Sequence, residues 1–212
     1  MGMDLNIYTQ PLSSDLIPKI KKRFADYKMD VEFHPDFKFN EEADTGFLPI
    51  KLKVLQAKTR HYDLFESEVY TGFEIYFDKY NYQEDLKSLH QVSVITEKKS
   101  FLRKLFGPKK VSAESIKDPE VFVGDKQTDD ILKHCTNDTL INWVPSHTSE
   151  LRVSLFFAAF LAEQAGGIIY DPQNERYLTP RQALEIFPNE IEEFELSVST
   201  EDFVLDRFEE WY

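Results

Sequence analysis

The chain has 212 residues, and its 38 Asp and Glu against 25 Lys and Arg give a formal net charge of −13. This acidity excludes a general nucleic-acid binder, because such proteins need net positive charge to displace counterions from phosphate. The single cysteine excludes a disulfide scaffold and a thiolate zinc site, and it fits a reducing compartment. Aromatic residues make up 14% of the chain, which favours a packed core over disorder.

The first 80 residues predict a strand, a helix and then three further strands. Residues 5–9 alternate between apolar and polar, as a strand does. Ser13 and Ser14 are expected to cap a helix whose apolar stripe consists of Leu16, Ile17, Ile20, Phe24 and Tyr27. Strands are then expected around Val31 and Phe33, over 47–55, and over 73–78, where Phe73, Ile75 and Phe77 face one way and Glu74, Tyr76 and Asp78 the other.

The middle of the chain, from about residue 80 to 138, shifts in composition. A strand is expected at 92–96, followed by a basic stretch at 98–110. Thr128 is expected to cap a short helix with Ile131, Leu132 and Cys135 on one face. We interpret residues 97–126 as a basic insertion or loop within one domain.

The remaining part of the chain predicts strand, helix, strand, turn and helix in succession. A strand at 139–144 precedes a helix over 151–165 that is N-capped by Thr148, apolar nearly all round and therefore expected to be buried. Gly166 is expected to end this helix in a left-handed conformation. A strand at 168–170 and a turn at 171–174 follow, and then a capping box at 179–182 opens a short helix to about residue 186.

One further helix is expected near the C-terminus. Thr200 is its predicted cap, and its apolar stripe consists of Val204, Phe208 and Trp211. Together these elements predict a single α+β domain over 1–212, an antiparallel-rich sheet with helices on one face. A ferredoxin-like arrangement is the simplest topology of this kind.

No motif in the sequence indicates catalysis, a cofactor or a metal. His134 and Cys135 are adjacent, and consecutive helical residues point in different directions, so they do not suggest a nucleophilic pair. His61, Asp63 and Glu66 are interpreted as solvated loop residues rather than metal ligands. The Gly166–Gly167 pair follows a helix instead of preceding one, which does not fit a phosphate-binding loop. We expect no catalytic residue, no cofactor and no metal.

No membrane segment is expected either. The start of the chain has no basic region followed by an apolar run, and the longest apolar run, 153–162, is about half of what a membrane-spanning helix needs. The sequence therefore predicts a soluble, cytoplasmic protein with no membrane contact.

The strongest charge feature is acidic. Residues 185–212 hold ten acidic side chains and one basic one, Arg207. A solvated surface explains them, and so does an acidic face that recruits a basic protein, since concentrated charge raises association rates. On the second interpretation the candidate partner-binding residues are Glu190, Glu192, Glu193, Glu195, Glu201 and Asp202. The basic stretch at 98–110 suggests either an exposed loop or an amphipathic helix that docks on a partner or on anionic lipid.

Three segments, 45–49, 70–74 and 150–173, carry a resemblance to a known group. They resemble a family of uncharacterised bacterial cytoplasmic proteins, some of which look like immunity proteins encoded beside secreted antibacterial toxins. The shared features are strand-entry glycines, a buried alanine-rich helix and a turn, so the resemblance implies a fold and a bacterial setting but no catalytic residues.

The leading hypothesis is therefore a non-enzymatic acidic protein of the immunity type. It would bind a basic toxin and block the toxin's active site or substrate path. Two alternatives stay open. One is a structural or scaffold subunit of a bacterial assembly, and the other is a small-molecule enzyme whose site the sequence does not show.

Overall fold

A computed structural model describes residues 2–39, 46–56, 68–87, 125–144 and 148–199. Their fold is α+β, with strands joined antiparallel into one sheet in the order β2-β3-β4-β5-β1-β6-β7. The strands are β1 (Met3–Thr9), β2 (Met29–Phe33), β3 (Gly46–Val54), β4 (Val69–Lys79), β5 (Asn137–Trp143), β6 (Ile168–Asp171) and β7 (Arg176–Leu178). The helices are α1 (Leu16–Asp26), α4 (Lys126–Leu132), α5 (Thr148–Gln164) and α6 (Pro180–Ser197), and residues 82–87 are also helical.

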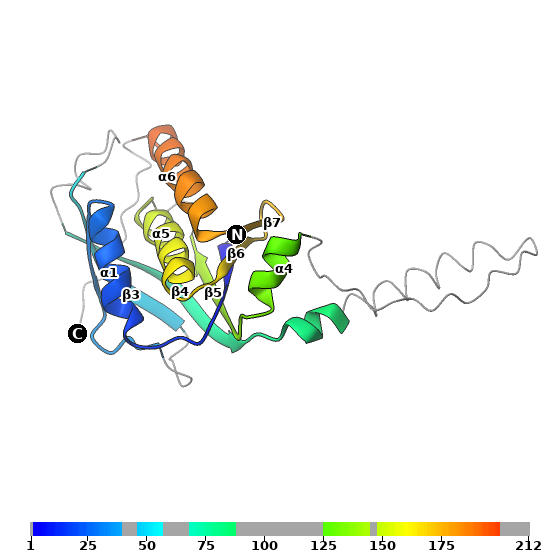
Figure 1. Ribbon diagram of the computed structural model, residues 1–212. Coiled ribbons are helices and arrows are strands. Elements are labelled where there is room, and N and C mark those ends of the chain that lie inside the picture. Colours follow the sequence, from blue (N-terminus) through cyan, green and yellow to red (C-terminus); the bar gives the residue numbers. More distant parts are fainter. Residues whose placement is uncertain (1, 40–45, 57–67, 88–124, 145–147, 200–212) are drawn as a thin grey trace, which may run out of the picture.

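Helices α1, α5 and α6 cover one face of the sheet, as the alternation of apolar residues predicts. Figure 1 shows these three helices side by side, with α4 apart from them beyond β6. The main core lies between the sheet and this helical layer, and it includes the inward residues of the strands, such as Ile7, Ile50 and Ile75. Each of these side chains is at most 1% exposed.

The centre of the helical layer is α5. All residues from Thr148 to Ala162 are buried, because the helix has the sheet beneath it and α1 and α6 beside it. Phe157 packs against Phe73 of β4 with ring centroids 5.0 Å apart, and Phe160 packs against Phe24 of α1 at the same distance. The expectation of a buried, apolar helix is confirmed. Gly166, at φ +66°, adopts the left-handed conformation expected after it.

Among the described residues, a second apolar cluster covers one end of the other face of the sheet. Tyr82, Leu132 of α4 and Ile168 of β6 form this smaller cluster, against which Tyr8, Tyr80 and Tyr177 pack, among others. The outward faces of β3, β4 and β5 take no part in this cluster.

Part of the sheet matches the ferredoxin-like arrangement. Helix α5 connects β5 to β6, and β1 lies between these two strands, which is a split β-α-β unit. Helix α1, in contrast, connects β1 to β2 at the far edge, with β3, β4 and β5 in between. The observed sheet is therefore wider than a ferredoxin-like one and has a different strand order.

Two predicted helix caps were wrong. Helix α1 begins at Leu16 without a side-chain cap, and Ser13 and Ser14 instead offer backbone oxygens to the amides of its first turn. The cap of α4 is Asp125, whose carboxylate accepts hydrogen bonds from the amide and the hydroxyl of Thr128 at 3.0 and 2.6 Å. Thr128 lies inside the helix because a carboxylate three residues earlier already satisfies its free amide.

Two other helix boundaries also differ from expectation. Thr148 is the first residue of α5 rather than the residue before it. The capping box of Thr179 and Gln182 is present, but α6 continues past Pro188 to Ser197. The helix continues because Phe187, Ile191 and Glu195 remain buried beyond the predicted end, so packing outweighs the hydrogen bond that the proline removes.

Several predicted features lie outside the described residues: the strand at 92–96, the basic stretch at 98–110, His61, Asp63 and Glu66, and the helix expected after Thr200. Among the helices that the structure describes, none has the length and apolarity that a membrane crossing requires.

Candidate functional site

The outward face of three neighbouring strands is acidic. Cross-strand register places Asp78 of β4 opposite Asp138 of β5, and Glu74 opposite Asn142, which in turn faces Asp4 of β1. We call the outward-facing residues of β1, β5 and the second half of β4 the acidic sheet face. They are Asp4, Asn6, Tyr8, Glu74, Tyr76, Asp78, Asp138, Leu140 and Asn142. Lysine and arginine are absent from this set, and Lys79, at the end of β4, has the opposite strand parity.

The exposed part of the acidic sheet face combines carboxylates with aromatic rings. Glu74 and Asp78 are exposed, and Tyr76 between them is 38% exposed. The Tyr76 hydroxyl donates a hydrogen bond of 3.1 Å to Glu74, and this bond raises the pKa of the phenol. Phe47 of β3 lies opposite Glu74 and is 44% exposed. A partner would therefore meet charge and apolar surface together.

Asp138 is a half-buried carboxylate of this face. Burial raises its pKa above the usual value, and the facing charges of Asp78 and Asp85 add to the rise. The amide of Asn6 donates to both of its oxygens, at 3.0 and 3.2 Å, which opposes the rise. The hydrogen bonds from Asn6 therefore stabilise the charged form of Asp138, which burial and the neighbouring acids destabilise.

A cluster of tyrosines adjoins the acidic sheet face at β6 and β7. The Tyr8 ring lies 4.5 Å from that of Tyr80, and the Tyr170 ring lies 4.7 Å from that of Tyr177. Burial raises the pKa values of Tyr8, Tyr80 and Tyr177 far above that of a free phenol. These hydroxyls are thus neutral, and none of the three is activated as a nucleophile or a base.

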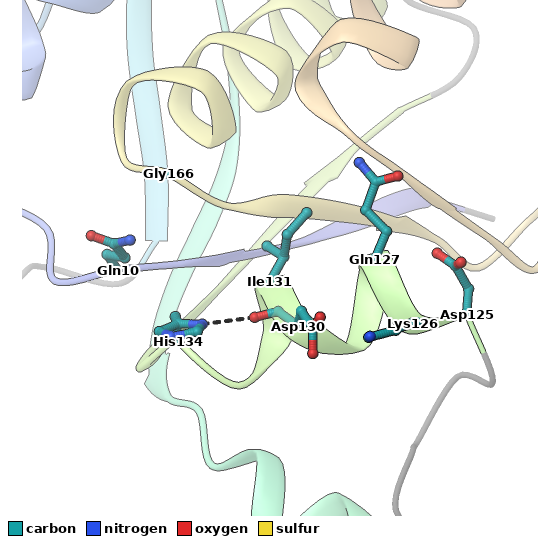
Figure 2. A pocket seen from close by; sticks show the side chains of 8 residues that line it. All are labelled: Gln10, Asp125, Lys126, Gln127, Asp130, Ile131, His134 and Gly166. Atoms are coloured by element: carbon teal, nitrogen blue, oxygen red, sulfur yellow. Dashed lines mark hydrogen bonds between the residues drawn. The ribbon is translucent and has the colours of Figure 1, made fainter.

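A shallow depression of about 700 Å³ lies beside α4. Figure 2 shows most of its side chains spread along α4 and its two ends rather than aimed at one point; they are Asp125, Lys126, Gln127, Asp130, Ile131 and His134. Gln10, which follows β1, and Gly166 line the depression from other segments. Nδ1 of His134, in the turn after α4, lies 2.7 Å from the backbone oxygen of Asp130. Because a carbonyl oxygen can only accept, this nitrogen carries the proton and donates it to the last turn of α4.

Cys135 is buried, and burial raises the pKa of its thiol to about 12. At neutral pH this thiol is protonated and a poor nucleophile. A metal site is also missing from the part of the chain that the structure describes, where no three His, Cys, Asp or Glu side chains gather closely enough to hold an ion.

Glu195 does not belong to a charged surface, contrary to the sequence-based prediction. Its side chain is 1% exposed, and its two oxygens accept hydrogen bonds of 2.8 and 2.6 Å from Arg152 of α5. The charge of Glu195 is thus used inside the protein, where it joins α5 to α6.

The other predicted partner-binding residues fall into three situations. Glu190 accepts a hydrogen bond of 2.8 Å from Arg176, a cation that it shares with Asp171. Glu192 is half-buried and Glu193 is exposed on α6. Glu201 and Asp202 lie outside the described residues. The described part of α6 therefore does not present the continuous acidic face that its sequence suggests.

Local sequence patterns indicated which residues of the acidic sheet face point outward from their strands. They did not indicate that β1, β4 and β5 lie side by side. Glu74, Tyr76 and Asp78 were expected to share one side of a strand, and they do. The contribution of Asp4 and Asp138 depends on pairing between segments more than 130 residues apart, such as Asn6 with Asp138.

Comparisons of the chain with protein-family models, with curated proteins and with solved structures gave no match.

Proposed function

We propose that the protein is a non-enzymatic binding protein whose acidic sheet face receives a basic protein partner. One observation carries this proposal: Asp4, Glu74, Asp78 and Asp138 occupy outward positions of three adjacent strands, with no lysine or arginine among them. The proposal keeps the predicted kind of partner but moves the binding surface from α6 to the sheet.

The physical argument rests on charge and on aromatic surface. Carboxylates gathered on one face create a field that steers a cationic partner and raises its association rate. Tyr76 and Phe47 add rings that a partner can cover, and aromatic residues are frequent anchors in protein interfaces. The resemblance to immunity proteins suggests, as part of this proposal, a basic toxin whose active site or substrate path is blocked on binding.

The test compares two variants of equal net charge. One carries Asp4→Asn, Glu74→Gln and Asp78→Asn on the acidic sheet face. The other carries Asp36→Asn, Glu175→Gln and Glu193→Gln, which are exposed residues elsewhere on the molecule. The partner is captured from an extract of the source organism and purified, and association rates are then measured by surface plasmon resonance at low and high salt.

At low salt we expect the acidic-face variant to associate about tenfold more slowly, and the control variant to stay within about twofold of the unmodified protein. High salt should reduce the difference, because it screens exposed charges. Equal slowing of both variants would assign the effect to net charge alone. Unchanged rates in both would remove the acidic sheet face from the interface.

A further inference from the structure

A second site lies at one end of the interface between the sheet and the helices. It is a cavity of about 250 Å³ between β1, β5, α5 and α6. Its walls are mostly apolar and include Leu5, Trp143, Leu155, Phe187 and Phe194. An apolar cavity of about 150 Å³ suffices for a benzene ring, so this one has room for a ring with a short chain.

The mouth of this cavity is polar and carries excess negative charge. Asp171 and Glu190 line it, together with Gln173 and Asn174. Arg176 lies 2.8 Å from a carboxylate oxygen of each of these two acids, so one cation stands between two anions.

Another carboxylate lies next to the mouth. Gln173 donates a hydrogen bond of 2.6 Å to Asp4 of β1, which places that acid beside the cavity lining. The surplus of acids over Arg176 favours a cation at the mouth and disfavours an anion.

We propose that this cavity binds a small organic cation that carries an apolar ring or chain. The apolar part fills the space lined by Trp143, Leu155 and Phe187, and the ammonium group lies at the mouth near Glu190 and Asp171. The site uses a different surface from the acidic sheet face, with only Asp4 near both, so its test does not depend on the proposed protein partner.

The indole of Trp143 provides the readout. The chain has two tryptophans, so Trp211→Phe leaves Trp143 as the only indole in the full-length protein. This protein is titrated with 2-phenylethylamine, with 2-phenylethanol as the neutral analogue and with phenylacetate as the anionic one, and calorimetry provides a second measurement. We expect saturable binding of the amine in the millimolar range, at least about fivefold weaker binding of the alcohol, and no binding of the acid.

A matched pair of variants tests the role of charge at the mouth. Glu190→Gln should weaken binding of the amine by about fivefold and leave binding of the alcohol unchanged, because the substitution removes a charge but little volume. Glu193 is exposed on the same helix and lies outside the cavity lining. Glu193→Gln should therefore leave the affinities for both compounds unchanged. The proposal is overturned if none of the three compounds saturates, if phenylacetate binds as tightly as the amine, or if the two variants behave alike.

Discussion

The contact between Arg152 and Glu195 makes a strong prediction about stability. The two side chains are 8% and 1% exposed, and two hydrogen bonds of 2.8 and 2.6 Å join the guanidinium to the carboxylate. Removing one partner of such a pair leaves an uncompensated charge inside the protein, which typically costs about 3–5 kcal/mol. We therefore expect Glu195→Gln to lower the free energy of unfolding by about that amount.

Urea unfolding followed by circular dichroism measures this effect. With a slope of about 2 kcal/mol per M, the transition midpoint should fall by about 2 M. Glu185→Gln on the same helix is the matched control, because the Arg181–Glu185 pair is 88% and 62% exposed. An exposed pair contributes little, so this control should shift stability by less than about 0.5 kcal/mol.

A double variant separates the buried charge from the pair itself. Arg152→Met combined with Glu195→Leu removes both charges and keeps apolar volume, so stability should return to within about 2 kcal/mol of the unmodified protein. If Glu195→Gln costs no more than Glu185→Gln, then the pair is solvated in solution and our description of the α5–α6 contact is wrong. A double variant as unstable as the sum of its single variants would contradict the argument as well.

Three further predictions follow from local geometry. Gly72→Ala should lower the melting temperature by at least about 4 °C in a thermal scan, because the added Cβ would lie 2.1 Å from the backbone oxygen of Leu48 on the neighbouring strand; an unchanged melting temperature would refute this close packing. Cys135, whose pKa is raised to about 12, should react with a thiol reagent at pH 8 at least about a hundredfold more slowly in the folded protein than in urea, and equal rates would show an accessible thiol. Since folding raises the pKa of Asp138, the folded state binds its proton more tightly, and stability should fall as pH rises from about 4 through the raised value. Asp138→Asn should remove that part of the pH dependence in urea titrations, and an identical pH profile would contradict the assigned burial.

Much of the fold could be predicted because it depends on local patterns. The alternation of Ile50, Leu52 and Val54 defines the inward side of β3, and the capping box at Thr179 marks the start of α6. The all-round apolar sequence of α5 indicates a central, buried helix. In each case the signal lies within one helix or one strand, so it can be identified without knowledge of the tertiary structure.

The candidate site could be predicted only in part, because it depends on contacts between distant segments. Glu195 looks like a surface residue in an acidic helix, and its partner Arg152 is 43 positions away. Strands β1, β4 and β5 become neighbours only through long-range pairing, which local alternation does not specify. For the same reason the predicted α6 is too short. Its continuation beyond Pro188 depends on packing against α5, which the local sequence does not show.

Carboxyl footprinting of the complex tests the central claim most directly. The protein is labelled with a carbodiimide and an amine, with and without its purified basic partner, and modified residues are quantified by mass spectrometry. We expect binding to protect Glu74 and Asp78 several-fold, while Asp36 and Glu193 keep their labelling. Protection of Glu193 with full labelling of Glu74 and Asp78 would instead place the partner on α6 and contradict the assignment of the acidic sheet face.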